Sequence, residues 1–315
     1  MKTKGLNAFQ LKLLMAVLMV FDHLEKIPGL LSGEWVSIFH ALTRCVAVWF
    51  AFAAVEGFLY TRSRLLYNMR LFFWSAIMFA GNTILNLLFH SKGVQIYNNI
   101  FLTLACGVLG LNIFFGINQT SKPVDIKRQP IRFILGIVVC LLAGFVTEGG
   151  MVIIPFMLIT YTCREKKNLR NLLYGILAVV LFCMSIQIYP TWSDTLLMMF
   201  YNSDWLFITV LPFISLYNGE RGPVTKWSKY FFYIFYPAHL WLITCIAYLV
   251  QKWVNYSLAA SNSLQSSIKK GEQDEYGKIL LKQDRQLLQP NVKDIEKAQF
   301  GYEVSQSAQQ LYFRF

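Results

Sequence analysis

LKLLMAVLMVFDHL, residues 11–24, is the stretch that decides the fold class. It is an apolar run of the kind that enters a membrane, yet it contains the adjacent ionisable residues Asp22 and His23. Ionisable groups are costly in hydrocarbon, so membrane proteins keep them mainly where they pair with other groups or take part in function. The stretch therefore predicts a membrane helix and marks the first candidate site.

The composition of the whole chain agrees with this interpretation. Of its 315 residues, 56% are hydrophobic and 15% are charged, and the mean hydropathy is +0.45. A soluble domain has about 25% charged residues. Long apolar stretches recur from residue 11 to residue 251. We therefore expect an all-α, polytopic membrane bundle.

The charges and cysteines exclude several other classes. The net charge of +12 comes from Lys and Arg in short segments between apolar runs, which is typical of cytoplasmic loops and not of a nucleic-acid-binding face. None of the six cysteines forms a CxxC motif, so we expect no disulfide framework and no metal site. The chain contains no GxSxG, HExxH, Walker or GxGxxG motif, so soluble-type nucleotide or metal chemistry has no support.

A membrane helix needs about 20 apolar residues. The predicted spans are 10–29, 35–60, 70–90, 97–117, 131–147, 149–163, 169–189, 195–217 and 230–251. The fifth and sixth are expected to form a hairpin that turns at Gly149-Gly150, because one helix over 131–163 would be about 50 Å long. The first span has no A-x-A cleavage site, so we expect a retained helix and not a signal peptide.

The basic residues set the predicted orientation. With a cytoplasmic N-terminus, Lys26 and Lys92 are the only Lys or Arg residues in the outer loops among the spans. The nine spans then place the C-terminus outside. We expect a membrane domain over 1–252 and a polar, partly disordered tail over 253–315, with an amphipathic helix near 276–289.

Two further residues in the second span could interact with the Asp22-His23 pair. Neighbouring helical residues point about 100° apart, so Asp22 and His23 do not easily face one another. On the predicted layout Arg44 lies at a similar depth, so Asp22 is its expected partner, and His23 is left to accept a proton. The alternative is that these groups only lock two helices together. Glu56 lies about 18 Å further along and is expected to pair with Arg62.

The last span contains a second histidine in the motif Tyr236-Pro237-Ala238-His239. Proline in a helix frees a backbone carbonyl and kinks the chain locally, so this helix could line a cavity with His239. A lone histidine at such a position is more often structural. The spacing alone leaves both interpretations open.

Taken together, residues 10–250 resemble the TraX family of membrane acetyltransferases, whose namesake acetylates conjugative pilin. The most specific segments are LYNGERG (216–222) and YFFYIFYPAHLWLI (230–243). The resemblance also rests on LKLLMAVLMVFDHL, VEGFLYTRSRLLYNMR (55–70), NNIFLTLACGVLGL (98–111) and TEGGMVIIPFMLITY (147–161). It implies a multi-pass protein of a bacterial plasma membrane that uses cytosolic acetyl-CoA as donor. The tail lies outside the resemblance.

The resemblance also implies roles for individual residues. The catalytic set would be His23, Asp22, Arg44 and His239, and the donor-binding set would be Tyr217, Asn218, Arg221, Asn99, Thr103, Arg62 and Glu56. The chain departs from the family pattern at Glu148-Gly149, where aspartate-tyrosine before glycine is usual, so the resemblance assigns no role to that outer turn.

Three functions remain open from the sequence. The leading hypothesis is acetyl transfer from acetyl-CoA to an amine or hydroxyl of a membrane or cell-surface acceptor, such as a pilin-like peptide or a surface glycan. In it, His23 acts as general base, Asp22 and Arg44 hold the site, and Arg221 contacts CoA. The alternatives are a small-solute transporter that uses the same polar cluster, and an assembly partner without catalysis.

Overall fold

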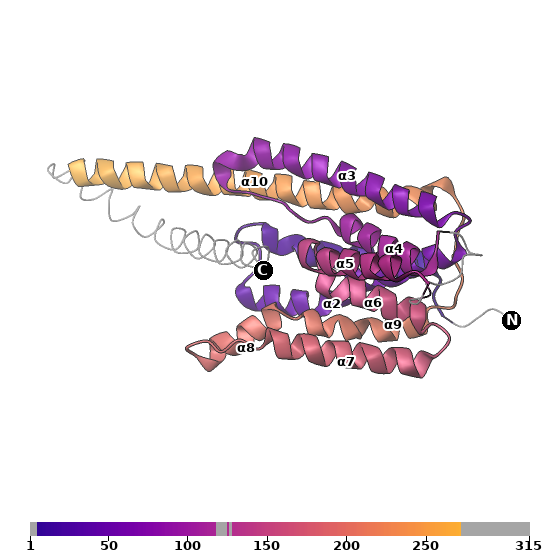
Figure 1. Cartoon of the computed structure of the whole chain (residues 1–315). Helices are drawn as coiled ribbons and strands as arrows, with labels where there is room; N and C mark the ends of the chain where they lie inside the picture. The colour runs from indigo at the N-terminus through magenta and orange to yellow at the C-terminus, as the bar shows by residue number, and fades with distance from the viewer. Residues whose placement is uncertain (1–4, 118–124, 126–127, 272–315) are drawn as a thin grey trace. The chain divides into compact units, whose positions relative to one another are not determined.

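The computed structural model describes residues 5–117, 125 and 128–271, and these residues form helices with no strand (Figure 1). The α-helices are α1 (Ala8–His23), α2 (Gly33–Tyr60), α3 (Arg64–Phe89), α4 (Ile100–Phe115), α5 (Pro130–Val146), α6 (Gly150–Thr162), α7 (Lys167–Ser185), α8 (Trp192–Tyr201), α9 (Leu211–Leu216) and α10 (Lys226–Gly271). Short 3₁₀ helices cover Leu24–Lys26, His90–Lys92 and Asp204–Val210. The all-α prediction is confirmed.

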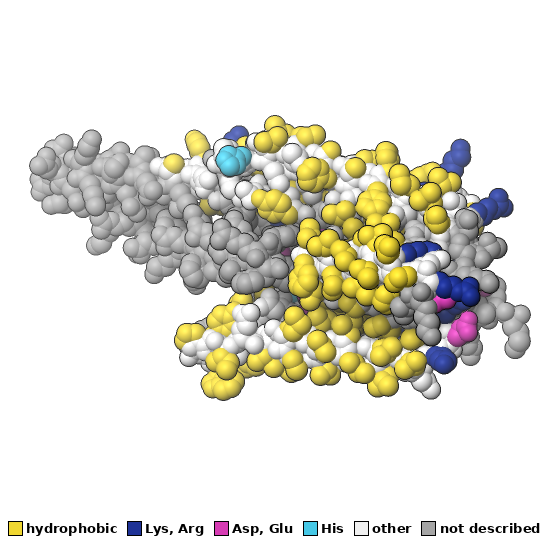
Figure 2. Space-filling view, in the orientation of Figure 1, with side chains coloured by type: hydrophobic (Ala, Val, Ile, Leu, Met, Phe, Trp, Pro, Cys, Tyr) yellow, Lys and Arg dark blue, Asp and Glu magenta, His cyan; other side chains and the backbone are white. Residues whose placement is uncertain are grey.

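Four of these helices are long and apolar enough to cross a membrane, namely Gly33–Tyr60, Arg64–Phe89, Lys167–Ser185 and Lys226–Ser257. Four shorter apolar helices, Ile100–Phe115, Pro130–Val146, Gly150–Thr162 and Asp204–Leu216, accompany them. Hydrophobic side chains cover the visible faces of α3, α5 and α7 (Figure 2). Such faces are stable in lipid and unfavourable in water, so the chain is a helical membrane protein.

The chain forms two compact units. Unit 1 comprises residues 1–22, 37–84 and 97–238, and unit 2 comprises residues 23–36, 85–96 and 239–315. In unit 1, α4 packs against α5 and α6, α6 packs against α7, and α7 packs against the 3₁₀ helix Asp204–Val210. The rings of Phe156 and Tyr174 stack with centroids 4.6 Å apart at the centre of this packing, and both are fully buried.

In unit 2, the end of α3 contacts the following loop and α10. The Asn86 side chain closes a ring of two hydrogen bonds with Ile96, donating to its carbonyl at 2.9 Å and accepting from its backbone N–H at 2.8 Å. Phe89 stacks on Tyr248 of α10 with ring centroids 4.3 Å apart. These contacts hold the loop 85–96 against α10.

The predicted hairpin between the fifth and sixth spans is confirmed. Helices α5 and α6 pack against one another and are separated by a tight turn in which Gly149 has φ +62°. A Cβ atom on Gly150 would lie 2.4 Å from the Ala143 carbonyl oxygen, so a larger residue does not fit there without movement of the backbone. The two glycines thus permit the turn that was predicted because a single helix over 131–163 would be too long for the membrane.

The predicted eighth span, 195–217, is wrong as a continuous helix. It is divided into α8, the 3₁₀ helix Asp204–Val210 and α9. The polar residues Asn202-Ser203-Asp204 interrupt the apolar run, and Pro212, which has no N–H to donate, lies in the first turn of α9. The interruption places Ser203 and Asp204 inside unit 1, where they meet Arg44.

The last helix extends beyond the predicted last span, 230–251. Helix α10 runs to Gly271 and so includes the first part of the predicted tail, 253–271. Residues 238–270 contain no glycine or proline, so no helix breaker accompanies the change from apolar to polar composition. The amphipathic helix predicted near 276–289 lies outside the described residues.

Candidate functional site

Two histidines from the two ends of the sequence meet in unit 2. His23 is the last residue of α1, and His239 lies two residues after Pro237 in α10. Their ring centroids are 5.5 Å apart with an interplanar angle of 34°. Both side chains are buried, each with 7% of its surface exposed. The sequence singled out each residue separately, and the structure brings them together.

A close imidazole pair is suited to proton transfer. Histidine changes charge near neutral pH, and each ring has two nitrogens that donate or accept according to the tautomer. One ring can therefore accept a proton from a substrate while the other supplies a proton elsewhere. Burial of both rings excludes most of the water that would compete for that proton.

Asp22, the residue before His23, belongs to unit 1 and contacts α2. The Thr43 hydroxyl donates a hydrogen bond to the Asp22 carboxylate. The same hydroxyl also lies 2.8 Å from the Phe39 carbonyl oxygen of its own helix. Thr43 thus joins α1 to α2 beside Arg44, which is its neighbour in the chain.

Arg44 has partners in unit 1 that the sequence did not suggest. Its guanidinium forms an ion pair with Asp204 at 3.2 Å and donates to the Ser203 hydroxyl at 3.2 Å. It also lies 2.6 Å from Nδ1 of His40, whose ring stacks on Tyr201. The sequence assigned no role to His40 or to Asp204. A pairing of Arg44 with Asp22 stays a prediction.

A half-buried polar network forms around Glu148 in the turn between α5 and α6, and we call it the glutamate network. The carboxylate accepts hydrogen bonds from the Asn98 side chain at 2.5 Å, from the Asn99 backbone N–H at 2.5 Å and from the Tyr236 hydroxyl at 3.4 Å. The Thr103 hydroxyl donates to the Glu148 carbonyl at 2.7 Å. The network joins α4, the turn and α10.

The glutamate network changes the roles expected of two donor-binding candidates. The Asn99 side chain caps α4 by accepting from the Leu102 N–H, and it donates to the Ser75 carbonyl at 3.1 Å. Thr103 is fully buried, with its hydroxyl on Glu148. Both side chains therefore serve the helix packing. The sequence missed Glu148, whose signal was a carboxylate between two apolar helices.

The other donor-binding candidates lie at a different end of unit 1. Backbone hydrogen bonds join the loop 216–222 to the N-terminal segment 5–8, and we call this arrangement the loop clip. Leu6 donates to the Leu216 carbonyl at 2.8 Å, Asn218 donates to the Leu6 carbonyl at 3.0 Å, and Ala8 donates to the Glu220 carbonyl at 2.9 Å. Arg221 is exposed in this loop. The clip holds the loop that the sequence identified.

Glu56 lies near the loop clip and interacts electrostatically with Arg170 and with Tyr217. The expected partner Arg62 is exposed, and its pairing with Glu56 stays a prediction. Tyr217 follows α9 in the loop, and burial, with a smaller effect of Glu56, raises the pKa of its hydroxyl to about 12. Tyr217 is therefore neutral at physiological pH and keeps a proton to donate.

Helix α4 separates the two polar regions of unit 1. Its first residue, Ile100, donates its N–H to the Tyr236 hydroxyl of the glutamate network. At its far end, the Phe115 carbonyl accepts from Arg64, whose guanidinium lies 4.2 Å from the Phe58 ring centroid. Sixteen residues of α-helix span about 24 Å. The glutamate network and Arg64 therefore lie at opposite ends of α4.

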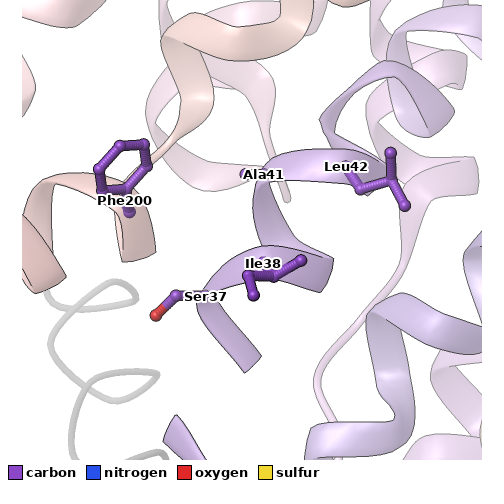
Figure 3. A pocket seen from close by; sticks show the side chains of 5 residues that line it. All are labelled: Ser37, Ile38, Ala41, Leu42 and Phe200. Atoms are coloured by element: carbon purple, nitrogen blue, oxygen red, sulfur yellow. The ribbon is translucent and has the colours of Figure 1, made fainter. Parts of the chain in front are cut away.

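An apolar pocket of about 510 Å³ opens between α2 and α8 (Figure 3). Ser37, Ile38, Ala41 and Leu42 of α2 and Phe200 of α8 line it. Its volume lies in the range of small-molecule sites, yet Ser37 provides its single hydroxyl. Within the described ranges, no group of three or more His, Cys, Asp or Glu side chains could hold a metal ion.

The chain matches the protein-family model described as TraX protein over residues 8–247. It belongs to the TraX family. No curated protein and no solved structure matches it. The family match covers α1 to α9 and α10 as far as residue 247, so both the histidine pair and the loop clip of this TraX family member lie inside it.

Proposed function

We propose that this TraX family member is a membrane acetyltransferase, which moves an acetyl group from cytosolic acetyl-CoA to an amine or hydroxyl of a membrane or cell-surface acceptor. A pilin-like peptide or a surface glycan fits this description, and the bacterial plasma membrane is the proposed location. The observation that carries the proposal is the buried pair of His23 and His239. Family membership supports it.

Acetyl transfer from a thioester requires one general base and one general acid. His23 takes the proton from the acceptor amine or hydroxyl as its nitrogen or oxygen attacks the acetyl carbonyl carbon. The carbon–sulfur bond of the thioester then breaks, and the departing CoA thiolate takes a proton. His239, 5.5 Å from His23 between ring centroids, is the proposed proton carrier or the group that polarises the donor carbonyl. Positioned acid–base groups contribute about 100-fold or more to rate.

The remaining groups support this site in separate ways. Asp22 and Arg44 lie on the contacting helices α1 and α2, and we assign them to holding the end of α1 that bears His23. The loop clip offers Tyr217, Asn218 and Arg221 to the nucleotide end of the donor. Asn99 and Thr103 act through the glutamate network, which secures Tyr236 three residues before His239.

The test uses membranes that contain the full chain and radiolabelled acetyl-CoA, with release of CoA thiol as a second readout. His23→Ala should reduce acetyl transfer by about 100-fold or more. His90→Ala is the matched control because His90 is exposed in the loop after α3. Full transfer by a normally inserted His23→Ala variant would refute the proposed base. Solute uptake by proteoliposomes without acetyl-CoA would favour the transporter instead.

A further inference from the structure

The beginning of α1 packs against the last residues of the loop clip. Gly222 has φ +83°, and a Cβ atom there would lie 2.6 Å from the Asn7 side-chain oxygen and 3.1 Å from the Phe9 Cβ. Phe9 in turn contacts Phe232 of α10, with ring centroids 5.8 Å apart. The first turn of α1, residues 221–222 and the start of α10 therefore form one packed corner of unit 1.

Helix geometry places Lys12 at this corner. Residues four apart lie on the same face of an α-helix, so Lys12 is one turn beyond Ala8, whose N–H binds the Glu220 carbonyl. The Lys12 ammonium lies 5.8 Å from the Phe232 ring centroid. Arg221, which follows Glu220, is close enough for its charge to act on Lys12.

Two like charges are thus brought together, while the neighbouring Glu220 carboxylate accepts a hydrogen bond from the Asn218 side chain. In the part of the chain that the structure describes, neither Lys12 nor Arg221 forms an ion pair. Basic side chains gather more widely at the end where α3, α5 and α7 begin (Figure 2). Such an arrangement is unfavourable by itself and becomes favourable when an anion binds between the cations.

We propose that Lys12 and Arg221 bind a phosphate group at this corner, with the loop clip setting the distance between them. Lysine and arginine are the residues that most often hold phosphate, arginine through its fork of N–H donors and lysine as a point charge. The source of the phosphate follows from the proposed function, on which this inference rests. It is the nucleotide end of the acetyl-CoA donor.

In this proposal the N-terminal segment positions Lys12 beside the loop clip. Asn7 and Gln10 bond one another reciprocally at the start of α1, with Asn7 N–H donating to the Gln10 side chain at 3.0 Å and Gln10 N–H donating to the Asn7 side chain at 2.9 Å. This capping fixes the first turn, and the three backbone bonds of the loop clip then fix the loop against it. Lys12 is therefore a donor-binding residue contributed by the first helix.

The experiment measures binding and does not need the acceptor. Full-length protein in zwitterionic lipid nanodiscs is titrated calorimetrically with CoA and with pantetheine, which lacks the phosphates of CoA. Lys12→Gln and Arg221→Gln should each weaken CoA binding by about tenfold and leave pantetheine binding unchanged. Lys12→Arg should restore most of the affinity. Lys229→Gln is the charge-matched control, because Lys229 is exposed on α10 and contacts Tyr230.

The phosphate could instead come from a lipid headgroup, and a second arm separates the two sources. The same variants are tested for retention of phosphatidylglycerol from mixed nanodiscs. Loss of lipid retention with unchanged CoA affinity would assign the site to a headgroup. Unchanged binding of both ligands, or an equal loss for CoA and pantetheine, would overturn the phosphate site. CoA binding without acetyl transfer would refute the proposed function and leave the phosphate site intact.

Discussion

The glutamate network and the loop clip differ in which groups form their hydrogen bonds and in which charges stay exposed. In the glutamate network, groups from α4, the turn and α10 satisfy one another around Glu148, and Tyr236 is buried. In the loop clip, backbone groups supply the hydrogen bonds, and Arg221 is left exposed. The first arrangement uses its polar atoms for stability. The second keeps its charges available for a soluble ligand.

This difference predicts where a mutation affects stability and where it affects binding. Removal of a half-buried, hydrogen-bonded carboxylate leaves its donors without their acceptor, and each donor that stays buried and unsatisfied costs about 1–3 kcal/mol. Removal of an exposed cation leaves the fold intact and weakens attraction to an anion. The two regions can therefore be separated experimentally by measuring unfolding and ligand affinity on the same variants.

The largest effect is expected from Glu148→Ala. The change leaves the Asn98 amide, the Asn99 N–H and the Tyr236 hydroxyl without their shared acceptor, so the free energy of unfolding should fall by about 3 kcal/mol or more. The measurement is the thermal unfolding midpoint in detergent. Glu165→Ala is the control, because Glu165 is exposed and its one ion pair among the described residues is with its neighbour Arg164. Equal unfolding midpoints for the two variants would show that the glutamate network does not stabilise the fold.

The sequence predicted the all-α fold, the hairpin at Gly149-Gly150 and the positions of the two histidines in separate helices. These predictions succeeded because helix length, glycine and hydropathy are local properties. It did not predict that His23 meets His239, because long-range packing sets that contact. It also paired Glu56 with its neighbour in sequence, Arg62, and did not indicate that the charge of Arg170, on another helix, acts on Glu56.

The hydrogen-bond partners were the hardest to predict. Asp204 lies inside an expected span, where the sequence gives no reason to pair it with Arg44. The pair forms because the helix breaks at this point. Glu148 stood out only as a departure from the family pattern, although its carboxylate holds three donors. A sequence shows which residue is polar. The fold decides which other polar residue reaches it.

Gly222→Ala should have an effect of intermediate size, and the effect should be on CoA affinity and not on stability. The added Cβ meets Asn7 and is strained at φ +83°, at a cost of about 1–3 kcal/mol that the exposed loop relieves by moving. We expect CoA affinity to fall several-fold while the unfolding midpoint changes little. Gly175→Ala is the matched control, since nothing lies within 4 Å of a Cβ there. A large drop in midpoint with unchanged CoA affinity would show that the clip serves stability.

The smallest effect is expected from salt. Its influence on CoA affinity and on stability compares the two regions most directly. Exposed charges are screened over about 8 Å at physiological ionic strength and over about 3 Å at 1 M, whereas buried pairs are screened much less. The affinity for CoA should therefore decrease as potassium chloride is raised, and the decrease should be shallower in Arg221→Gln because one exposed cation is gone. The destabilisation caused by Glu148→Ala should stay nearly constant over the same range, because its lost hydrogen bonds are partly buried and come from uncharged donors. An equal salt dependence of both quantities would mean that the two regions do not differ in the way their contacts indicate.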